Sequence, residues 1–452
     1  MAEVYDRWHL SRPKKDAEPC PDHSSRTRTL VPSADHGKGK RWQVRWRGVD
    51  GQQRKENFDK RAQADTRAAT VEADLARGLY VDPAAGRESF RAVGERWRTS
   101  AVHRPATAER VERALRNHVY PAFGDRPIAS VRPSEVQTWI KGRAQVLAPS
   151  TLKVVYAYLV TIFRTAVRDR IIAANPCDGI KPPAKRRKEI IPLHPDAVGA
   201  LAEAAPVWYR ALIVLGAASG LRQGELFGLE VGDVDFLRRE VHVRQQLVGP
   251  DGGEPYLGEP KTHESYRTVP LAKQAVEALS LHLARFPARE TKIEDRTNPR
   301  KPRTRAAELL FLSERNEPFR RGAWSRTWAV AVRNANKALG ERHAAAHARW
   351  VKRGRQGQEP ELVQVPKGAS MHDLRHFYAS LLIRHREDVK TVQRRLGHAK
   401  PSITLDTYTH LWPDQEDTTR VAVEMVLNGV PSLCPGASGE VPGAQVRRLS
   451  QR

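Results

Sequence analysis

Six residues of types that can bind or transfer a phosphate group follow one another in the C-terminal half of the chain. In order they are Arg222, Lys261, His372, Arg375, His398 and Tyr408. Arginine suits such a site because its planar fork donates two parallel hydrogen bonds to phosphate oxygens and keeps its charge near neutral pH. Arg222 lies three residues before Glu225, and His372 lies three residues before Arg375, so on helices each pair shares a face. Two guanidiniums can therefore converge on one phosphate and stabilise the charge that develops there.

The His-x-x-Arg motif carries little information by itself. It occurs at His9/Arg12, His23/Arg26, His282/Arg285 and His372/Arg375, close to the number that chance predicts with 16 histidines and 77 Lys+Arg. The other residues also have simple structural interpretations: Arg222 as a surface ion pair, and Tyr408 as a core tyrosine with a bonded hydroxyl. Only the last His-x-x-Arg pair lies within an ordered series of motifs.

That series is specific. It runs Gly220-Leu221-Arg222-Gln223-Gly224-Glu225, Lys261-Thr262, Arg267-Thr268-Val269-Pro270-Leu271, Met371-His372-Asp373-Leu374-Arg375-His376, Leu396-Gly397-His398 and Thr404-Leu405-Asp406-Thr407-Tyr408-Thr409-His410. In order and spacing it resembles the tyrosine recombinase family, the phage-integrase type of DNA strand-exchange enzyme, at every active-site position. The match extends from Arg222 to Tyr408.

The resemblance implies a role for each matched residue. Tyr408 attacks the scissile phosphorus, which forms a 3′-phosphotyrosyl link and frees a 5′-hydroxyl; because free tyrosine has a pKa of about 10, the phenol must lose its proton during attack. His372 is the candidate general base. Lys261, expected at the tip of a β-hairpin, is the candidate general acid for the leaving oxygen. His398 donates to a phosphate oxygen, and Glu225 orients the arginine beside it.

Four further residues near these motifs are interpreted as structural, namely Trp324, Trp328, His376 and His410. Tyr378, which follows the His-x-x-Arg pair closely, is the alternative nucleophile.

The charge of the chain favours a polyanionic partner. Its formal net charge is +25 and its pI is near 10.3, which indicates nucleic acid more readily than other partners. An anionic membrane surface is the competing interpretation, but the longest mainly apolar stretch, residues 211–221, is far shorter than the ~20 residues of a spanning helix. The first residues also lack the apolar core of a signal peptide. We therefore expect a cytoplasmic, nucleoid-associated bacterial protein without a membrane partner.

Cysteine and glycine motifs give no support to metal or nucleotide chemistry. The three cysteines, Cys20, Cys177 and Cys434, form no C-x-x-C pair, so structural zinc and a disulfide framework are both unexpected. No His-Glu-x-x-His motif and no phosphate-binding glycine loop occurs. The prediction is a site without metal or cofactor, which agrees with a covalent ester that stores the broken bond without ATP.

A length of 452 residues predicts about three domains. The expected fold is multidomain: a small β-β-α module like an arm-binding domain, an all-α, SAM-like core-binding domain, and a mixed α+β, mainly α catalytic domain. The expected boundaries are a disordered lead-in at 1–35, the basic arm-type module at 36–80, the helical domain at 88–180, the catalytic domain at 189–429 and a tail at 430–452.

Hydrophobic periodicity predicts the elements within these domains. A hairpin is expected at 42–58, helices at 61–77, 89–100, 107–119, 133–144 and 150–168, and strands at 240–246, 267–270 and 309–312. Residues 181–188 form a basic linker that either follows DNA phosphates or is a solvated joint. Residues 287–305 and 342–367 are expected to be irregular surface insertions.

Taken together, the residues and the resemblance predict a site-specific DNA integrase of a mobile element. Its expected partners are double-stranded DNA attachment sites, three further copies of itself in a homotetramer on DNA, and an accessory DNA-bending protein or excisionase. A type IB topoisomerase or a dimer-resolving recombinase would use the same chemistry, and the basic hairpin favours integration because it supplies a second DNA contact. A DNA-binding regulator without activity is the non-enzyme alternative.

Overall fold

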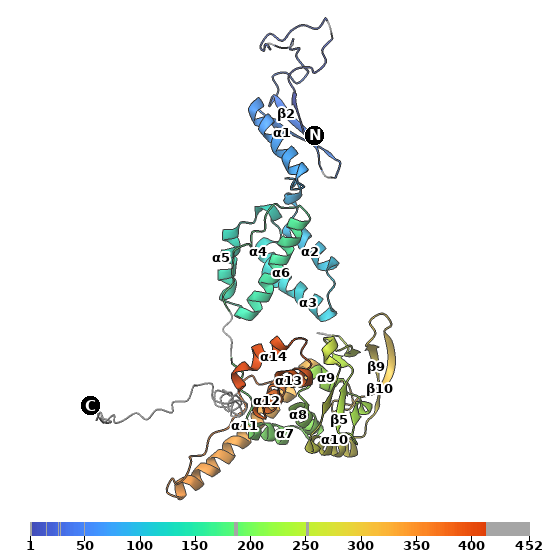
Figure 1. The fold of residues 1–452 in the computed structure, drawn as a ribbon, viewed down its shortest axis with the longest axis vertical. Coiled ribbons are helices and arrows are strands. Elements are labelled where there is room, and N and C mark those ends of the chain that lie inside the picture. Colours follow the sequence, from blue (N-terminus) through green and yellow to red (C-terminus); the bar gives the residue numbers. More distant parts are fainter. Residues whose placement is uncertain are drawn as a thin grey trace, which may run out of the picture. The chain divides into compact units, whose positions relative to one another are not determined.

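The computed structural model describes residues 2–14, 16–25, 27, 29–48, 50–184, 189–249 and 253–412. The chain divides into two compact units, residues 1–187 and 188–452 (Figure 1). The predicted tail, the predicted end of the catalytic domain at 413–429 and the basic linker residues 185–188 lie outside the described residues.

An antiparallel sheet and one helix form the N-terminal module. The strands β1 (Glu3–Asp6), β2 (Trp42–Arg47) and β3 (Gln53–Phe58) lie in the order β1-β2-β3, and α1 (Arg61–Ala76) packs against them. Val44 and Trp46 face the buried side of α1, and the Trp46 indole Nε1 donates to the Tyr80 hydroxyl at 2.9 Å. The hairpin and the helix predicted here are confirmed.

The prediction of a disordered lead-in at 1–35 is wrong for part of that segment. Strand β1 pairs with β2 along its whole length, with Glu3 opposite Arg45, and His9 forms an isolated bridge with Pro32. Leu30 is buried. The sequence shows no apolar periodicity here because backbone pairing and a cluster of polar side chains, not an apolar stripe, hold the segment.

The helical domain is centred on one long helix that buries a single face. Its helices are α2 (Phe90–Ser100), α3 (Pro105–Ala114), α4 (Tyr120–Phe123), α5 (Pro133–Ala144) and α6 (Pro149–Arg168), with 3-10 turns at Ala85–Arg87 and Ile128–Ser130. The buried positions of α6 are those of the predicted stripe, Leu152, Val155, Tyr156, Leu159, Ile162, Phe163 and Ala166. The helix predicted at 107–119 continues beyond Ala114 as a π turn, Leu115–Val119.

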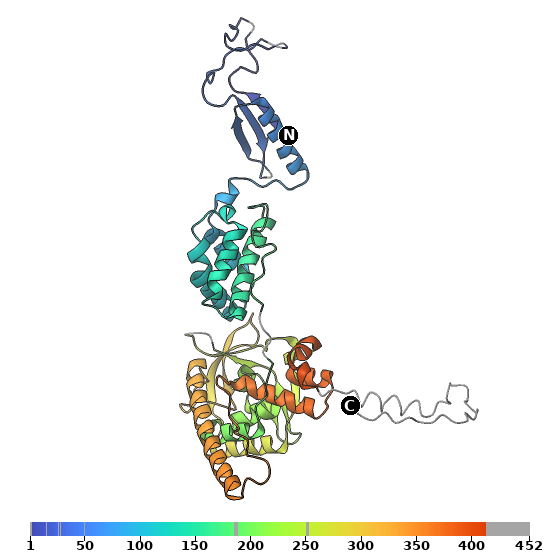
Figure 2. The same cartoon turned by 90° about the vertical axis from the view of Figure 1, so that its left-hand side faces the viewer.

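The remaining α-helices of the described residues all lie in the C-terminal unit. They are α7 (Pro195–Ala204), α8 (Val207–Ser219), α9 (Gln223–Phe227), α10 (Lys273–Arg285), α11 (Arg321–Lys352), α12 (Met371–Arg384), α13 (Val389–Leu396) and α14 (Pro401–Tyr408), with 3-10 turns at Val231–Asp233, His263–Ser265 and Thr409–Leu411. Helix α8 packs against α7, α10 and α12, so its apolar residues form the centre of the core. Figure 2 shows α11, in orange, along the outside of this unit.

Two small sheets complete the unit. One has the order β4-β5-β8, from β4 (Val234–Asp235), β5 (Glu240–Val243) and β8 (Arg267–Pro270). The other has the order β10-β9-β7-β6, from β6 (Gln246–Val248), β7 (Tyr256–Gly258), β9 (Glu290–Arg296) and β10 (Arg303–Glu308). The pair β7 and β9 is parallel, and the others are antiparallel. The predicted fold class is confirmed, with a third strand added to the N-terminal module.

Several element predictions in this unit need correction. The strand predicted at 240–246 is two strands in different sheets, because Gln245 leaves the ladder and its amide Nε2 donates to the Gly228 carbonyl at 2.8 Å. Residues 309–312 are not a strand: Leu309 makes an isolated bridge with Glu230, and the Leu310 N–H donates to the Leu229 carbonyl. Their apolar run is explained by burial in the core.

The two predicted insertions are regular structure in part, whereas residues 353–367 are irregular as predicted. Within 287–305, β9 pairs with β10 and buries Ile293 and Asp295, and the charge on its other positions hides the alternation. Within 342–367, α11 continues to Lys352 through residues 342–352, where alanines favour helix although few side chains meet the core.

Candidate active site

Arg222 lies at the start of α9, directly after the turn that ends α8. Gly220 makes this turn with φ +62, and a Cβ there would lie 2.4 Å from Cδ1 of Tyr378, so glycine is required. The Arg222 guanidinium donates from Nη1 to Glu225 Oε1 at 2.7 Å and to the Ser265 hydroxyl at 3.0 Å. Its Nη2 donates to the Gly397 carbonyl at 2.8 Å. These bonds fix the guanidinium plane.

Glu225 is the buried anion of this site. Its Oε2 accepts from the backbone N–H of Arg222 at 2.9 Å and from Nη2 of Arg267 at 2.8 Å. Burial by itself would raise the pKa of Glu225, but Arg267 and then Arg222 hold that pKa below its usual value. Because Arg267 Nε also donates to the Arg395 carbonyl at 2.7 Å, Glu225 joins α9, β8 and the end of α13. The role predicted for Glu225, to orient the arginine beside it, stays a prediction.

Arg375 is the most deeply buried cation of the site. It is 1% exposed on α12 and donates to the carbonyls of Gly220 at 2.8 Å and Leu396 at 2.6 Å. Burial, and then the charge of Arg222, lowers the pKa of Arg375, but a guanidinium remains protonated at neutral pH. Arg222 and Arg375 therefore bind successive carbonyls, those of Gly397 and Leu396.

His398 follows the same turn. Gly397 ends α13 with φ +63, and a Cβ there would lie 2.9 Å from the Glu264 carbonyl. His398 is buried, and its Nδ1 lies 2.9 Å from the Thr404 hydroxyl. Burial, and then Arg375, lowers the pKa of His398 to about 3, so the ring is neutral at pH 7.

Tyr408 is the last residue of α14 and is 1% exposed. Its hydroxyl lies 2.8 Å from Nδ1 of His376. Burial raises the pKa of Tyr408 to about 12 and, with the neighbouring His372, lowers the pKa of His376 to about 4. The described state therefore pairs a neutral phenol with a neutral imidazole.

His372 lies beside this pair. Its ring meets that of His376 edge-on with centroids 4.6 Å apart, and the side chain is exposed at the start of α12. Desolvation and the charge of Arg375 lower the pKa of His372. The residue in contact with the Tyr408 hydroxyl is His376, so the assignment of His372 as general base stays a prediction.

Lys261 is exposed and does not lie at a hairpin tip. Lys261 does not lie between the paired strands β6 and β7 but follows β7 on the way to β8. Within the described ranges its ammonium has no hydrogen-bond or ion-pair partner. The next residue, Thr262, has its hydroxyl 3.1 Å from that of Ser265, which in turn accepts from Arg222.

The structure thus brings together Arg222, Glu225, Arg375, His398 and Tyr408, with His372 at the edge and Lys261 exposed nearby in the fold. Four functional candidates were missed in the sequence: Ser265, Arg267, His376 and Thr404. Arg267, His376 and Thr404 stand inside the quoted motifs, so their position was a usable signal. Ser265 lies outside these motifs, so the sequence offers no signal for it. The structural assignment holds for Trp324 and Trp328, which are buried in the core, and for His410, which bonds the Ile190 carbonyl at 3.0 Å.

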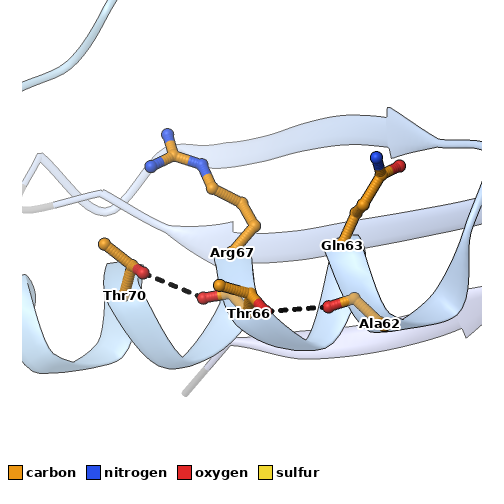
Figure 3. A pocket seen from close by; sticks show the side chains of 5 residues that line it. All are labelled: Ala62, Gln63, Thr66, Arg67 and Thr70. Atoms are coloured by element: carbon orange, nitrogen blue, oxygen red, sulfur yellow. Dashed lines mark hydrogen bonds between the residues drawn. The ribbon is translucent and has the colours of Figure 1, made fainter.

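A shallow depression lies on the surface of α1. Figure 3 shows its lining, Ala62, Gln63, Thr66, Arg67 and Thr70. The hydroxyls of Thr70 and Thr66 bond carbonyls one turn earlier in the helix, each at 2.9 Å, and Arg67 Nε donates to Glu56 at 2.9 Å. This surface contains no nucleophile or base that is free for chemistry.

Comparison with known proteins identifies the group to which this geometry belongs. The profile of the phage integrase family matches residues 193–414, and that of the phage integrase central domain matches residues 90–182. Together they cover more than two thirds of the chain. The chain belongs to the phage integrase family. This integrase is accordingly a tyrosine-type DNA recombinase, and the family predicted from its motifs is confirmed.

Individual relatives agree with this assignment. The integrase is 27% identical over 333 residues to a tyrosine recombinase XerC-like protein of Caldanaerobacter subterraneus subsp. tengcongensis, with 69% of this chain and 76% of the relative covered. It is 26% identical over 380 residues to the putative prophage phiRv2 integrase of Mycobacterium tuberculosis, with 82% and 88% covered.

Solved structures share the fold. The Tn1549 transposon integrase in complex with transposon right end DNA has a TM-score of 0.58 at 21% identity, with 75% of this chain and 99% of that chain covered. A λ integrase dimer bound to a COC′ core site has a TM-score of 0.51 at 17% identity, with 83% and 93% covered. In the part of this integrase that the structure describes, no helix is both long and apolar enough to cross a membrane.

Proposed function

We propose that this integrase cuts and rejoins double-stranded DNA at attachment sites through a 3′-phosphotyrosyl link to Tyr408, and so inserts a mobile element. The observation that carries the proposal is the contact between the Tyr408 hydroxyl and Nδ1 of His376, which are 2.8 Å apart. His376 lies on α12, the helix that also carries Arg375. A tyrosine in contact with a neutral base and close to fixed guanidiniums suits attack on a phosphodiester.

The phosphate would be bound at the turn that ends α13. Arg222 and Arg375 are anchored to neighbouring carbonyls of that turn, and His398 follows directly. Glu225 is shared between Arg222 and Arg267, so the positive charge exceeds the negative charge at the site. Donors that are fixed before the reaction stabilise the charge of the phosphorane without having to reorganise.

The reaction moves one proton at each end. The Tyr408 oxygen bonds to phosphorus as its proton passes to a histidine, and the bond from phosphorus to the 5′ oxygen breaks as that oxygen takes a proton from Lys261. Rejoining runs the same steps in reverse with the 5′-hydroxyl of another strand. Because the ester conserves the bond, neither ATP nor a catalytic metal is needed.

Two histidines are candidates for the base. The contact with the Tyr408 hydroxyl favours His376, while the motif favours His372, whose exposed ring lies next to it. We propose that His376 takes or relays the phenol proton and that His372 faces the phosphate. The low pKa of His376 keeps the imidazole neutral at pH 7, so its Nδ1 can accept the hydrogen bond of the phenol; because such a ring binds a proton only weakly, it would pass the proton on rather than retain it.

The proposed partners follow from charge and stoichiometry. A net charge of +25 favours DNA. Each copy has one Tyr408, and exchange between two duplexes cuts four strands, so we propose a homotetramer on DNA in the nucleoid of a bacterial cytoplasm. An accessory DNA-bending protein or an excisionase would set the direction of the reaction.

The domain roles are also proposals. Residues 36–80 would bind arm-type sites, 88–180 the core site, and 189–429 would hold the chemistry, with 430–452 as a tail. Removal of residues 1–85 should leave cleavage of a core site unchanged and abolish efficient integration. Equal integration by the truncated and the full-length protein would contradict separate arm and core contacts.

An integration assay tests the function as a whole. Purified integrase is incubated, without ATP, with a plasmid that carries the DNA flanking its coding region and with host DNA. A joint product with site-specific junctions supports the proposal. Relaxation of supercoils without junctions indicates a topoisomerase, exchange only between repeats of one circle indicates a resolvase, and binding without covalent complexes indicates a regulator.

A further inference from the structure

Four potential metal ligands cluster in the N-terminal module, in a different unit from the active site. They are His9, Cys20, His23 and His36, and one donor atom from each lies within 4.8 Å of all the others. The Cys20 sulfur is 3.1 Å from Nε2 of His36 and 3.5 Å from Nδ1 of His23, and those two nitrogens are 3.3 Å apart. Four residues from separate positions of the chain thus present their donors to one point.

We propose that these four side chains bind a structural zinc ion. In a tetrahedral site, zinc bonds of about 2.0–2.1 Å to nitrogen and about 2.3 Å to sulfur separate the donor atoms by roughly 3.3–3.6 Å. The three distances between Cys20, His23 and His36 fall close to that range. The donor atoms of these three residues are therefore close enough to one another to bind the same ion.

His9 supplies an independent observation. The residue is 3% exposed, and its Nε2 is buried without a hydrogen-bond partner among the described residues. Its Nδ1 lies 2.9 Å from Oδ2 of Asp6, so Nε2 is the nitrogen left for a metal. Asp6 is itself held by Arg41 at 2.8 Å. A carboxylate on the far nitrogen is the usual support of a zinc-binding histidine, and a bound ion removes the cost of a buried unpaired nitrogen.

The donor set favours zinc in a structural role. One thiolate with three imidazoles is a borderline-soft set that suits zinc better than calcium or magnesium, which prefer oxygen. Four protein ligands leave no open position for a water or substrate. Binding displaces the proton of the Cys20 thiol to solvent, so the three neutral imidazoles, the thiolate and the ion carry one net positive charge.

The positions of the ligands suggest what the ion does. His9 follows β1, His36 precedes β2, and Cys20 and His23 lie in the loop between these strands. The loop has few apolar anchors, among them Leu30, whose carbonyl accepts from the Cys20 N–H at 2.7 Å. A small module gains stability from such a cross-link because its own core is limited. The sequence-based expectation of no zinc counted C-x-x-C pairs and overlooked histidine ligands.

Metal analysis of the intact chain tests the proposal. Full-length integrase with a histidine-free affinity tag is produced in medium that contains zinc and is then passed through a mild chelating resin. The metal that remains bound is measured by mass spectrometry. We expect about one zinc per chain, also in the controls Cys177→Ala and Cys434→Ser. The Cys20→Ser variant should retain only a small part of the zinc that the wild-type protein binds.

A ligand exchange keeps the test valid if Cys20→Ser fails to fold. His23→Cys keeps four ligands and should retain the zinc; with cobalt in its place, the thiolate-to-metal absorption should be about twice that of the wild type, because one thiolate becomes two. Wild-type protein without zinc, or Cys20→Ser with as much zinc as Cys177→Ala, would overturn the proposal. So would an unchanged cobalt spectrum in His23→Cys. None of these readouts depends on recombination.

Discussion

The hydroxyl of Tyr408, at the end of α14, lies 2.8 Å from Nδ1 of His376 on α12. The contact joins the helix that carries the nucleophile to the helix that carries Arg375, through a ring whose pKa burial lowers to about 4. A neutral imidazole at this distance can hold the phenol in place and accept its proton.

Substitution of His376 should therefore slow cleavage without weakening DNA binding. We expect His376→Ala to lower the single-turnover cleavage rate by about 10²-fold, within the range for loss of a general base. His376→Asn can keep a hydrogen bond to the hydroxyl but cannot take up a proton. Recovery of the rate in His376→Asn would reduce His376 to a positioning role, and a wild-type rate in His376→Ala would exclude both roles. His410→Ala, which changes a histidine outside this contact, is the control.

A second prediction concerns the tautomer of His398. If the Thr404 hydroxyl donates to Nδ1, the ring proton lies on Nε2, where it can reach a phosphate oxygen. Thr404→Val removes that donor with little change in volume and should lower the cleavage rate about 10-fold or more. Thr404→Ser keeps the hydroxyl and should cleave like the wild type. Equal rates for the two variants would contradict this coupling.

How much of this site follows from the sequence can be judged residue by residue. The order of the motifs was sufficient to find Arg222, Arg375, His398 and Tyr408, because each stands in a short pattern with a fixed neighbour. Ser265 was beyond reach, since its contact with Arg222 joins positions 43 residues apart through the path of a loop. The sequence assigns His376 a structural role because a helical pattern does not tell which of two histidines one turn apart contacts another helix.

Some elements of the fold were likewise predictable from the sequence, and others were not. The stripe of α6 was predictable because a fully buried helix face repeats with the helical period. Strand β1 was not, since its four residues are held by pairing with a strand about 40 positions later. The cluster of Cys20 with three histidines was likewise hidden, because histidines spaced 13 and 14 residues apart match no metal motif in the sequence.

Substitution of Lys261 and substitution of Arg222 should slow cleavage for different reasons. Without the ammonium of Lys261, the 5′ alkoxide leaves slowly, and the expected loss is about 10²–10⁴-fold. A substrate with sulfur in the bridging 5′ position needs no proton to leave, so it should restore much of the rate of Lys261→Ala. Arg222→Ala should remain slow on both substrates because the non-bridging oxygens still lack their donor. Single-turnover cleavage decides the matter: equal rescue of both variants, or none for Lys261→Ala, removes Lys261 from the role of general acid.

The buried His398 should make stability depend on pH. Its pKa is about 3 in the folded chain and about 6.5 when unfolded. Below pH 6.5 the unfolded chain binds a proton that the folded chain does not, so the free energy of unfolding falls as the pH is lowered, by about 1.4 kcal/mol per unit at most. Between pH 7 and pH 5, His398→Asn should therefore lose less stability than the wild type in denaturant titrations of the full chain. The exposed His385→Asn should behave like the wild type, and parallel losses in all three proteins would contradict the argument.

The covalent link to Tyr408 is the central claim, and a nicked suicide substrate tests it most directly. Loss of a short fragment after cleavage prevents rejoining, so the protein remains attached to the DNA in a denaturing gel. Wild-type integrase and the control Tyr378→Phe should form this complex at similar rates. Tyr408→Phe should form none while binding the DNA with nearly unchanged affinity, because phosphate contacts dominate binding. A covalent complex with Tyr408→Phe, or its absence only in Tyr378→Phe, would contradict the account.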